Sequence, residues 1–253
     1  MIDSKLKGIH EEIEKFNETM AVKMTNEEKA HMTDTMYKTL QYSSNIVWEN
    51  QEDVFLVKKP NELLEIYTLR SKIYKNMGYN KEFPDTIQGI NFDHFDENSA
   101  VLYTKTKGKI TGACRIIFDS GYKLPIDNNF SLEYIRRNEC RLAELSRLMI
   151  VKEKKGMNME FKYLTAGVYN LMVENKYDKL ISVIKDEHFS LYNKFGGFEK
   201  EAAMETYGEL ENPFIITVWN ISKISTFFKK VFLGRRGYNL TPKSRNSFDK
   251  LAS

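Results

Sequence analysis

The first forty residues carry apolar side chains at the spacing of an α-helix. Between residues 5 and 20, every third or fourth position is apolar, at Leu6, Ile9, Ile13, Phe16 and Met20. This period predicts an amphipathic helix. Thr25 and Glu28 have the spacing of a capping box, in which each side chain bonds the backbone N–H of the other residue. We therefore expect a second helix from about Thr25 to about Leu40.

Three more helices are predicted further along the chain. Pro60 suits the first turn of a helix and Gly78 suits its end, so residues between them should form one long helix. An apolar stripe predicts another helix over 159–175. Residues 188–195 are predicted to be a short helix, which Gly196 and Gly197 would terminate.

Short apolar stretches bounded by turn residues predict the strands. They are 53–57, 101–106, 109–118, 140–151, 179–184 and 212–221. The second and third would form a hairpin. Residues 80–98 have no clear period and are expected to be a long loop, and 121–133 is expected to be a loop or a short helix. A hairpin followed by alternating strands and helices predicts an α/β (α+β) fold with a mixed central β-sheet flanked by helices.

Three parts of the chain are expected. A helical extension would occupy 1–49, the central domain 50–220, and a basic amphipathic tail 221–253.

The stretch 140–151, CRLAELSRLMIV, combines the apolar density of a buried strand with several charges. A regular strand would place Glu144 and Arg147 on opposite faces, whereas a helix would place them on one face. The pattern fits both structures equally well. In a strand, each buried charge would need a partner. A bulge near Leu145 would bring Glu144 and Arg147 to one side, and without it they would have separate roles on separate faces.

Composition and charge narrow the classes of protein. The chain has 253 residues, of which 42% are hydrophobic, with four histidines and two cysteines that show no metal-ligand spacing. A net charge of +3 gives no reason to expect nucleic acid as a partner. No apolar run is long enough to span a membrane, and the first residues lack the apolar core of a signal peptide, so we expect a cytoplasmic protein with reduced thiols. The segment 221–253 carries eight basic residues and one acidic residue, which leaves the rest of the chain at about −4.

An ordered set of residues resembles the signature of two related enzyme groups, the acyl-homoserine-lactone synthases and the N-acyl amino acid synthases, both acyl-transferring branches of the GNAT fold. The set consists of Arg70, Tyr74, Tyr79, Asp93, His94, Phe95, Asp96, Gly112, Ala113, Cys114, Arg115, Phe130, Glu144, Leu145, Ser146 and Arg147. It covers roughly residues 63–150, with fold-level similarity to about 220. The resemblance implies a GNAT-like fold in which 140–151 is the fourth strand.

The resemblance also implies an acyltransferase that makes an amide from a thioester and an amine. Glu144 would be the base, directly or through a water, and backbone N–H groups around 148–151 would stabilise the oxyanion. Tyr192 would be a general acid for the thiolate, although a packing role is at least as common for such a tyrosine. The catalytic set is then Glu144, Arg147 and Tyr192. The set that orders the loop and binds the acceptor, unless it is only a scaffold, is Arg70, Asp93, Asp96, Arg115 and Ser146.

Departures from the family pattern bear on both substrates. Tyr79 replaces a tryptophan and Asn91 replaces an acid, which argues against S-adenosylmethionine as the acceptor and leaves an amino acid or another small amine. Glu153 and Asn158 depart from the loop that holds the coenzyme A pyrophosphate in ordinary acetyltransferases of this fold. The phosphopantetheine of an acyl carrier protein would not need that loop, so acyl carrier protein is the expected partner, with acyl-CoA as the alternative donor and no tightly bound cofactor.

The expected donor-binding residues lie at the end of the strand at 140–151 and in the stretch that follows it. They are Met149, Val151, Lys154, Lys155 and Gly156. Lysines in this stretch would suit an acidic carrier protein, although a solvated turn is the commoner role for lysines alone. Cys114 could carry the acyl group covalently, yet a small buried thiol is the usual case.

Two alternatives remain for the tail. Its residues 221–236 mix apolar and basic side chains, so this segment would either dock on anionic lipid as a peripheral membrane contact or pack on the domain. For the whole protein, the leading hypothesis is an N-acyltransferase acting on an amino acid. The alternatives are an acyl-homoserine-lactone synthase and a non-catalytic binding protein of the same fold.

Overall fold

A computed structural model provides the structure of the chain. It describes residues 4–20, 23–49, 51–119, 121, 123–137, 140–151, 158–210 and 213–234. No helix within these ranges is long and apolar enough to cross a membrane.

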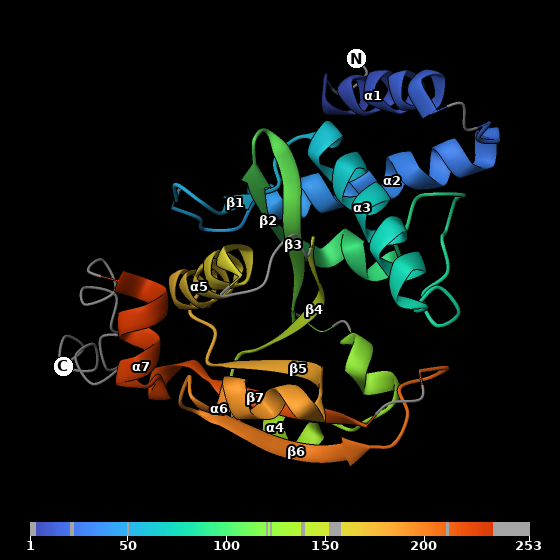
Figure 1. Cartoon of the computed structure of the whole chain (residues 1–253). Coiled ribbons are helices and arrows are strands. Elements are labelled where there is room, and N and C mark those ends of the chain that lie inside the picture. Colours follow the sequence, from blue (N-terminus) through green and yellow to red (C-terminus); the bar gives the residue numbers. More distant parts are fainter. Residues whose placement is uncertain are drawn as a thin grey trace, which may run out of the picture.

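A seven-stranded sheet forms the centre of the molecule (Figure 1). Its strands lie in the order β1-β2-β3-β4-β5-β7-β6. All neighbouring pairs are antiparallel except β4 and β5, which are parallel. The strands are β1 (Phe55–Leu56), β2 (Ser99–Thr106), β3 (Lys109–Phe118), β4 (Leu142–Ile150), β5 (Lys179–Lys185), β6 (Phe198–Met204) and β7 (Phe214–Asn220).

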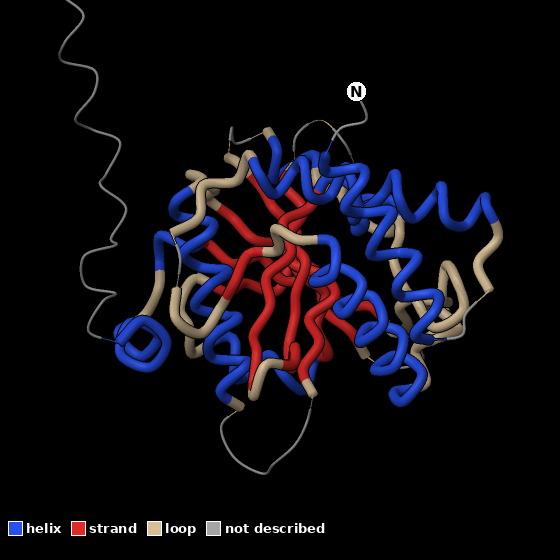
Figure 2. The backbone as a smooth tube through the Cα atoms, turned by 90° about the horizontal axis from the view of Figure 1, so that it is seen from above, coloured by secondary structure: helices blue, strands red, loops and turns tan. Residues whose placement is uncertain are grey.

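Helices cover both faces of the sheet, as Figure 2 shows from above. The longer ones are α1 (Ser4–Met20), α2 (Asn26–Ser44), α3 (Pro60–Met77) and α5 (Met159–Glu174). Short helical segments precede, connect or follow the strands: η1 (His94–Asn98), η2 (Pro125–Asn128), α4 (Glu133–Arg136), η3 (Asp186–His188) and α6 (Phe189–Asn193), and, after the last strand, η4 (Ile221–Lys223), α7 (Thr226–Phe228) and η5 (Lys229–Leu233).

The two faces of the sheet bury different cores. Along β2, Val101 and Tyr103 join the core beneath α1, α2 and α3, whereas Leu102 joins the core beneath α5. Both faces are covered, which explains why the hairpin strands are almost continuously apolar in the sequence. The N-terminal helices therefore form one cover of the sheet, with Ile9 and Met32 fully buried in the same cluster as Val101.

Strands β4 and β5 separate partway along their length. They pair only from Leu142 opposite Lys179 to Leu145 opposite Ser182. Beyond these residues the two strands diverge, as Figure 1 shows. The divergence opens the sheet next to the charged half of β4.

An irregularity in β4 determines which side chains face the opening. Ser146 pairs with Arg115 and Met149 pairs with Ala113. An advance of three residues along β4 is therefore matched by only two along β3, which is a β-bulge. Arg147, within this bulge, has a φ of 55°. The bulge turns Ser146 and Arg147 to the α3 face, and Leu148 to the α5 face. The predicted strand is thus confirmed as the fourth of seven, and the bulge lies two residues beyond the predicted position.

Most predicted elements are present, including the capping box of Thr25 and Glu28. Strand β6 is an element that the sequence pattern did not predict. It is the outermost strand, and its FEKEAAM sequence has charged residues that suit an edge and obscure a period of two. Residues 221–234 pack on the domain, one of the two alternatives for the tail, because Ile221 and Phe228 are buried in the α5-side core.

Candidate active site

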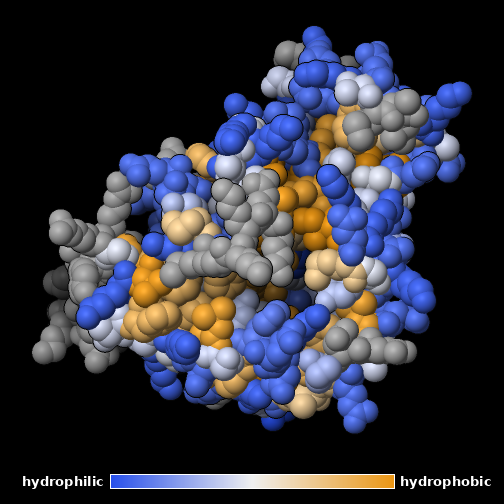
Figure 3. Space-filling view, in the orientation of Figure 1, coloured by the Kyte–Doolittle hydropathy of each residue, from blue (hydrophilic) through white to orange (hydrophobic). Residues whose placement is uncertain are grey.

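The opening between β4 and β5 leads into a cleft of about 1400 Å³. Apolar side chains, orange in Figure 3, gather around the hollow in the middle of this face. The cleft has a charged part, formed by β3, β4 and the loop before β2, and an apolar part, formed by α5, α6 and the C-terminal segment.

Five charged residues form a network at the charged end. Arg70, on α3, makes two hydrogen bonds to Asp96, of 2.8 and 3.1 Å. Asp93 bridges two guanidinium groups, with Arg115 Nη1 at 2.5 Å and Arg147 Nη2 at 2.7 Å. Arg115 also contacts Asp96 at 3.1 Å. Every one of these five charges therefore has an opposite charge beside it, as burial requires.

The two aspartates also build the loop that carries them. Asp93 accepts a hydrogen bond from the Phe95 N–H at 2.9 Å, and Asp96 accepts one from the Asp93 N–H at 2.9 Å, so the pair caps η1. Burial alone would raise the pKa of Asp93, but the guanidinium groups of Arg115 and Arg147 hold this pKa well below its usual range. The same pairing raises the pKa of Arg115 against the effect of its burial. Asp93 and Arg115 therefore stay charged at every ordinary pH.

Glu144 differs from the paired carboxylates. It is 3% exposed and lines the cleft, and its Oε2 accepts a hydrogen bond of 3.0 Å from the Ile126 N–H. Burial raises the pKa of Glu144 to about 7, partly opposed by that N–H and by Arg115. Glu144 can therefore gain and lose a proton near neutral pH, which is what a general base requires. Glu144 and Arg147 both line this cleft, but they form no direct ion pair with each other.

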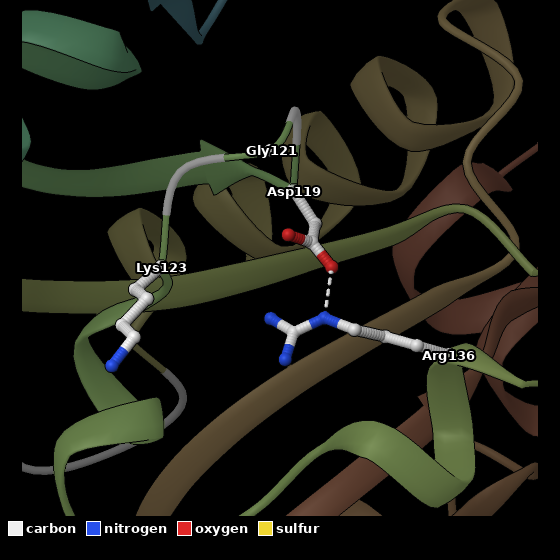
Figure 4. Close-up of a pocket in the computed structure, with 4 residues that line it drawn as sticks. All are labelled: Asp119, Gly121, Lys123 and Arg136. Atoms are coloured by element: carbon white, nitrogen blue, oxygen red, sulfur yellow. Dashed lines mark hydrogen bonds and ion pairs between the residues drawn. The ribbon is translucent and has the colours of Figure 1, made fainter.

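A second polar cluster fixes the turn that bonds Glu144. Arg136 pairs with Asp119 at 2.7 Å and with Asp127 at 2.6 Å. Figure 4 shows Arg136 and Asp119 beside a small hollow of about 410 Å³. Because Asp127 also accepts the Leu124 N–H at 2.8 Å, the cluster clamps η2, which contains Ile126. The Arg136 charge is fully paired, so we assign this hollow no ligand.

Tyr192 lies in the apolar part of the cleft, on α6. Its ring packs against Phe161, Phe195 and Phe198, with ring centroids 5.4 to 5.9 Å apart. Burial raises the pKa of Tyr192 to about 12, so its hydroxyl group stays protonated and can donate. The packing role and the acid role expected for Tyr192 are thus compatible.

Aromatic residues outside the predicted set complete the charged end. The Arg147 guanidinium lies over the Phe83 ring, 4.1 Å from its centroid, and Tyr207 packs against Phe83 at 6.0 Å. Burial raises the pKa of Tyr207 to about 12, and the neighbouring Glu144 adds to this effect. Tyr207 comes from the loop between β6 and β7, far from the motif in sequence, so no local signal pointed to it.

Asn91 has a structural role that explains one departure from the family pattern. Its side-chain amide donates to the carbonyl oxygens of Phe83 and Pro84, at 3.0 and 2.8 Å. A carboxylate at this position has no N–H to donate. Asn91 thus holds the turn that places Phe83 under Arg147.

The expected donor-binding residues divide into two groups. Met149 and Val151 line the cleft, whereas Lys154, Lys155 and Gly156 lie outside the described residues. The Val151 N–H donates to the Thr111 carbonyl oxygen at 2.8 Å. This N–H group is therefore occupied within the sheet, and the oxyanion role expected of the backbone N–H groups around 148–151 stays a prediction.

Two other chemistries have no support at this site. Cys114 is 1% exposed in the core beneath α5, and burial raises its pKa well above the usual range, which disfavours a nucleophilic thiolate. Within the described residues there is no group of three or more His, Cys, Asp or Glu placed to hold a metal ion.

Comparisons with known proteins bear on the family and the fold. A sequence model of the family described as N-acyl amino acid synthase FeeM matches residues 65–219, more than half of the chain. None of the curated protein sequences matches this chain.

Solved structures share the fold. FeeM, an N-acyl amino acid synthase from uncultured soil microbes, is 21% identical with a TM-score of 0.56, over 67% of this chain and 95% of FeeM. The acyl-homoserine-lactone synthase LasI is 13% identical with a TM-score of 0.54, over 73% of this chain and 96% of LasI. BjaI, a CoA-dependent acyl-homoserine lactone synthase solved with SAM and isopentyl-CoA, is 14% identical with a TM-score of 0.54, over 70% of this chain and 82% of BjaI. The predicted GNAT-like fold is confirmed.

Proposed function

The chain belongs to the N-acyl amino acid synthase FeeM family of acyltransferases, and we propose that it transfers a fatty acyl group from a thioester to the amine of an amino acid or a similar small amine. One observation carries the proposal. A single cleft joins Glu144, whose burial raises its pKa to about 7, to a branch lined by aromatic and aliphatic side chains. The polar end suits an amine acceptor and the apolar end suits an acyl chain.

The proposed reaction assigns a proton transfer to each of two residues. The Glu144 carboxylate takes a proton from the acceptor nitrogen, which attacks the thioester carbonyl carbon and forms the C–N bond. When the C–S bond breaks, the thiolate leaves and accepts a proton from the Tyr192 hydroxyl. Water then takes the proton from Glu144 and returns one to Tyr192, which restores the enzyme. The products are an amide and a free thiol, and no oxidant or metal is needed.

Arg147 is the best-placed group to hold an acceptor carboxylate. Its side chain is 12% exposed, whereas those of Arg115 and Arg70 are 2% and 1% exposed. Arg147 is therefore the most accessible of the three from the cleft, while Asp93, the Tyr74 hydroxyl group at 3.4 Å and the Phe83 ring fix its position. A guanidinium group matches a carboxylate in both charge and geometry. In this proposal the other polar residues of the network position Arg147 and the loop around it. They are Arg70, Asp93, Asp96, Arg115 and Ser146.

Acyl carrier protein is the proposed donor partner, because the sequence departs from the pyrophosphate-binding loop at Glu153 and Asn158. Asn158 instead caps α5, accepting the Phe161 N–H at 3.1 Å. Direct comparison of kcat/KM for acyl carrier protein and CoA thioesters of the same chain tests this choice. A higher value for the CoA thioester would contradict it.

Product analysis tests the function itself. The full-length protein is incubated with acyl donors and, separately, with each amino acid or with S-adenosylmethionine, and the lipids are analysed by mass spectrometry. We expect an N-acyl amino acid whose formation is lost in Glu144→Gln. An acyl lactone formed from S-adenosylmethionine would instead identify a lactone synthase. No product from any acceptor, with donor binding retained, would identify a non-catalytic binding protein.

A further inference from the structure

The segment 221–234 closes the apolar end of the cleft. It comprises η4, α7 and η5 and follows the region 65–219 that the family model matches. Figure 1 shows α7 beside α5. This wall of the cleft is therefore built by a part of the chain outside the family pattern.

Tight backbone contacts fix the segment to the end of α6. The Ser225 N–H donates to the Phe195 carbonyl oxygen at 2.7 Å, and the Ser225 hydroxyl group donates to that of Lys194 at 2.6 Å. Gly196 and Gly197 have φ values of 78° and 76°, and a Cβ at Gly196 would lie 2.6 Å from the Ser225 nitrogen. Only glycine permits both the positive φ and so close an approach of the two backbone segments. The wall is thus held in place by hydrogen bonds and close packing.

The side chains of the segment have two distinct positions. Phe228 is fully buried in the core, whereas Val231 and Phe232 line the cleft. The Phe232 ring lies 4.7 Å from that of Phe195 and 4.9 Å from that of Phe228, between centroids. Phe232 therefore packs against the core on one side and exposes part of its ring to the cleft on the other.

The position of this wall relative to the reacting groups indicates its role. Glu144 and Arg147 contact the loops on the α3 face of the sheet, whereas Phe232 belongs to the α5-side core. The cleft thus passes through the opening between β4 and β5, with the charged network at one end and the C-terminal segment at the other. An acyl chain whose carbonyl carbon lies near Glu144 would extend toward Val231 and Phe232.

We propose that Val231 and Phe232 form the end wall of the acyl site and set the longest acyl chain that the enzyme accepts. The inference rests on the proposed function, because it assigns the apolar branch to the acyl group. A packed wall discriminates between chains through the methylene groups that it admits or rejects, each worth about ten- to 200-fold in specificity.

Substitutions of Val231 test the wall, because this side chain is partly exposed and lines the cleft. Val231→Ala should shift the preference toward longer saturated chains, and Val231→Phe toward shorter ones, each by about tenfold in the ratio of kcat/KM values. Lys230→Ala is the matched control, because Lys230 is the exposed neighbour of Val231 in the same segment and does not line the cleft. It should leave the length preference unchanged.

A binding measurement separates this inference from the proposed function. Trp219 lines the cleft and its Nε1 donates to the Gly196 carbonyl oxygen at 3.0 Å. In a Trp48→Phe background, which leaves Trp219 as the only tryptophan, its fluorescence should report the binding of acyl-pantetheine thioesters of graded length. A shift in the preferred length between the Val231 variants supports the wall. If the preference shifts but no amide forms, the wall stands and the proposed function is overturned. If amide forms and both Val231 variants keep the wild-type preference, the wall is overturned and the function stands.

Discussion

Asp93 and Glu144 are two carboxylates on one cleft, the first half-buried and the second buried, and their pKa values are shifted in opposite directions. Asp93 has two guanidinium groups beside it, and its pKa lies well below the usual range. Glu144 has one backbone N–H at 3.0 Å, and burial raises its pKa to about 7. Burial without a charged partner favours the neutral acid, whereas pairing favours the carboxylate. The comparison separates a group that maintains the shape of the site from a group that can exchange protons.

Removing the charge of Glu144 should have the largest effect on catalysis. Glu144→Gln keeps the shape and an acceptor for the Ile126 N–H but cannot take a proton, so kcat should fall by about 10²- to 10⁴-fold. Steady-state kinetics at saturating donor measures this loss. A variant with wild-type kcat would remove Glu144 from the mechanism.

The same variant should be more stable than the wild type at alkaline pH. Because its pKa is raised to about 7, native Glu144 keeps a proton that the unfolded chain releases near its usual pKa of about 4.3. The stability of the wild type therefore falls as pH rises between these values, by on the order of 3 kcal/mol from this group. Denaturation of both proteins at about pH 5 and about pH 8 should show a gap that widens with pH.

Breaking the paired network should instead reduce the stability of the fold. Asp96→Asn leaves the Arg70 guanidinium, 1% exposed, without its carboxylate. Loss of one partner of a buried ion pair costs about 3–5 kcal/mol in the free energy of unfolding, which urea denaturation measures. Glu97→Gln, which breaks an exposed contact to Lys38 at 3.1 Å, is the control and should leave the midpoint nearly unchanged. Equal losses in the two variants would contradict the distinction between the buried network and surface pairs.

Loosening the clamp on η2 should shift the titration of Glu144 by a smaller amount. Arg136→Met removes the ion pairs to Asp119 and Asp127, which frees the turn that contains Ile126. Weaker donation from the Ile126 N–H should raise the pKa of Glu144 further, by about one unit or less. The pH midpoint of kcat/KM should move upward, with activity recovered at alkaline pH. Arg137→Met is the control, because Arg137 pairs only at the surface with Glu133; a similar shift in both variants would exclude the clamp as its cause.

Tyr192→Phe should have the smallest effect. A thiol has a pKa of about 8.5, so a thiolate can leave near neutral pH without a proton from Tyr192. Phenylalanine also keeps the packing against Phe161, Phe195 and Phe198. We expect kcat to fall by about tenfold or less, below the range of about 10²- to 10⁴-fold for an essential general acid. A loss as large as that of Glu144→Gln would give Tyr192 an essential role in proton transfer.

Sequence predicted the parts of the site that the motif contains. The charged stretch at 140–151 is a central strand. The structure also brings the polar residues of the motif together as a network, which consists of Arg70, Asp93, Asp96, Arg115, Ser146 and Arg147. The sequence left two arrangements open, a bulge near Leu145 or separate roles for Glu144 and Arg147 on separate faces. The choice between them and the position of the bulge depend on the register of β3 against β4, which tertiary pairing determines rather than local pattern.

The remaining features depend on contacts between distant segments. Phe83 and Tyr207 meet across the cleft from loops more than a hundred residues apart, and strand β6 is recognisable only from its pairing with β7. The inward packing of Phe228 and Phe232 likewise cannot be distinguished in sequence from an amphipathic helix that docks on lipid.

The pH dependence of kcat/KM in the wild type and in Glu144→Gln tests the role of Glu144 most directly. Titration of the acceptor amine affects both proteins equally, so the difference between the two profiles reports on Glu144 alone. We predict an additional rise in the wild type with a midpoint at a pH of about 7, the value to which burial raises the pKa of Glu144, and no such rise in the residual activity of the variant. The same midpoint in both proteins would contradict the assignment of Glu144 as the base.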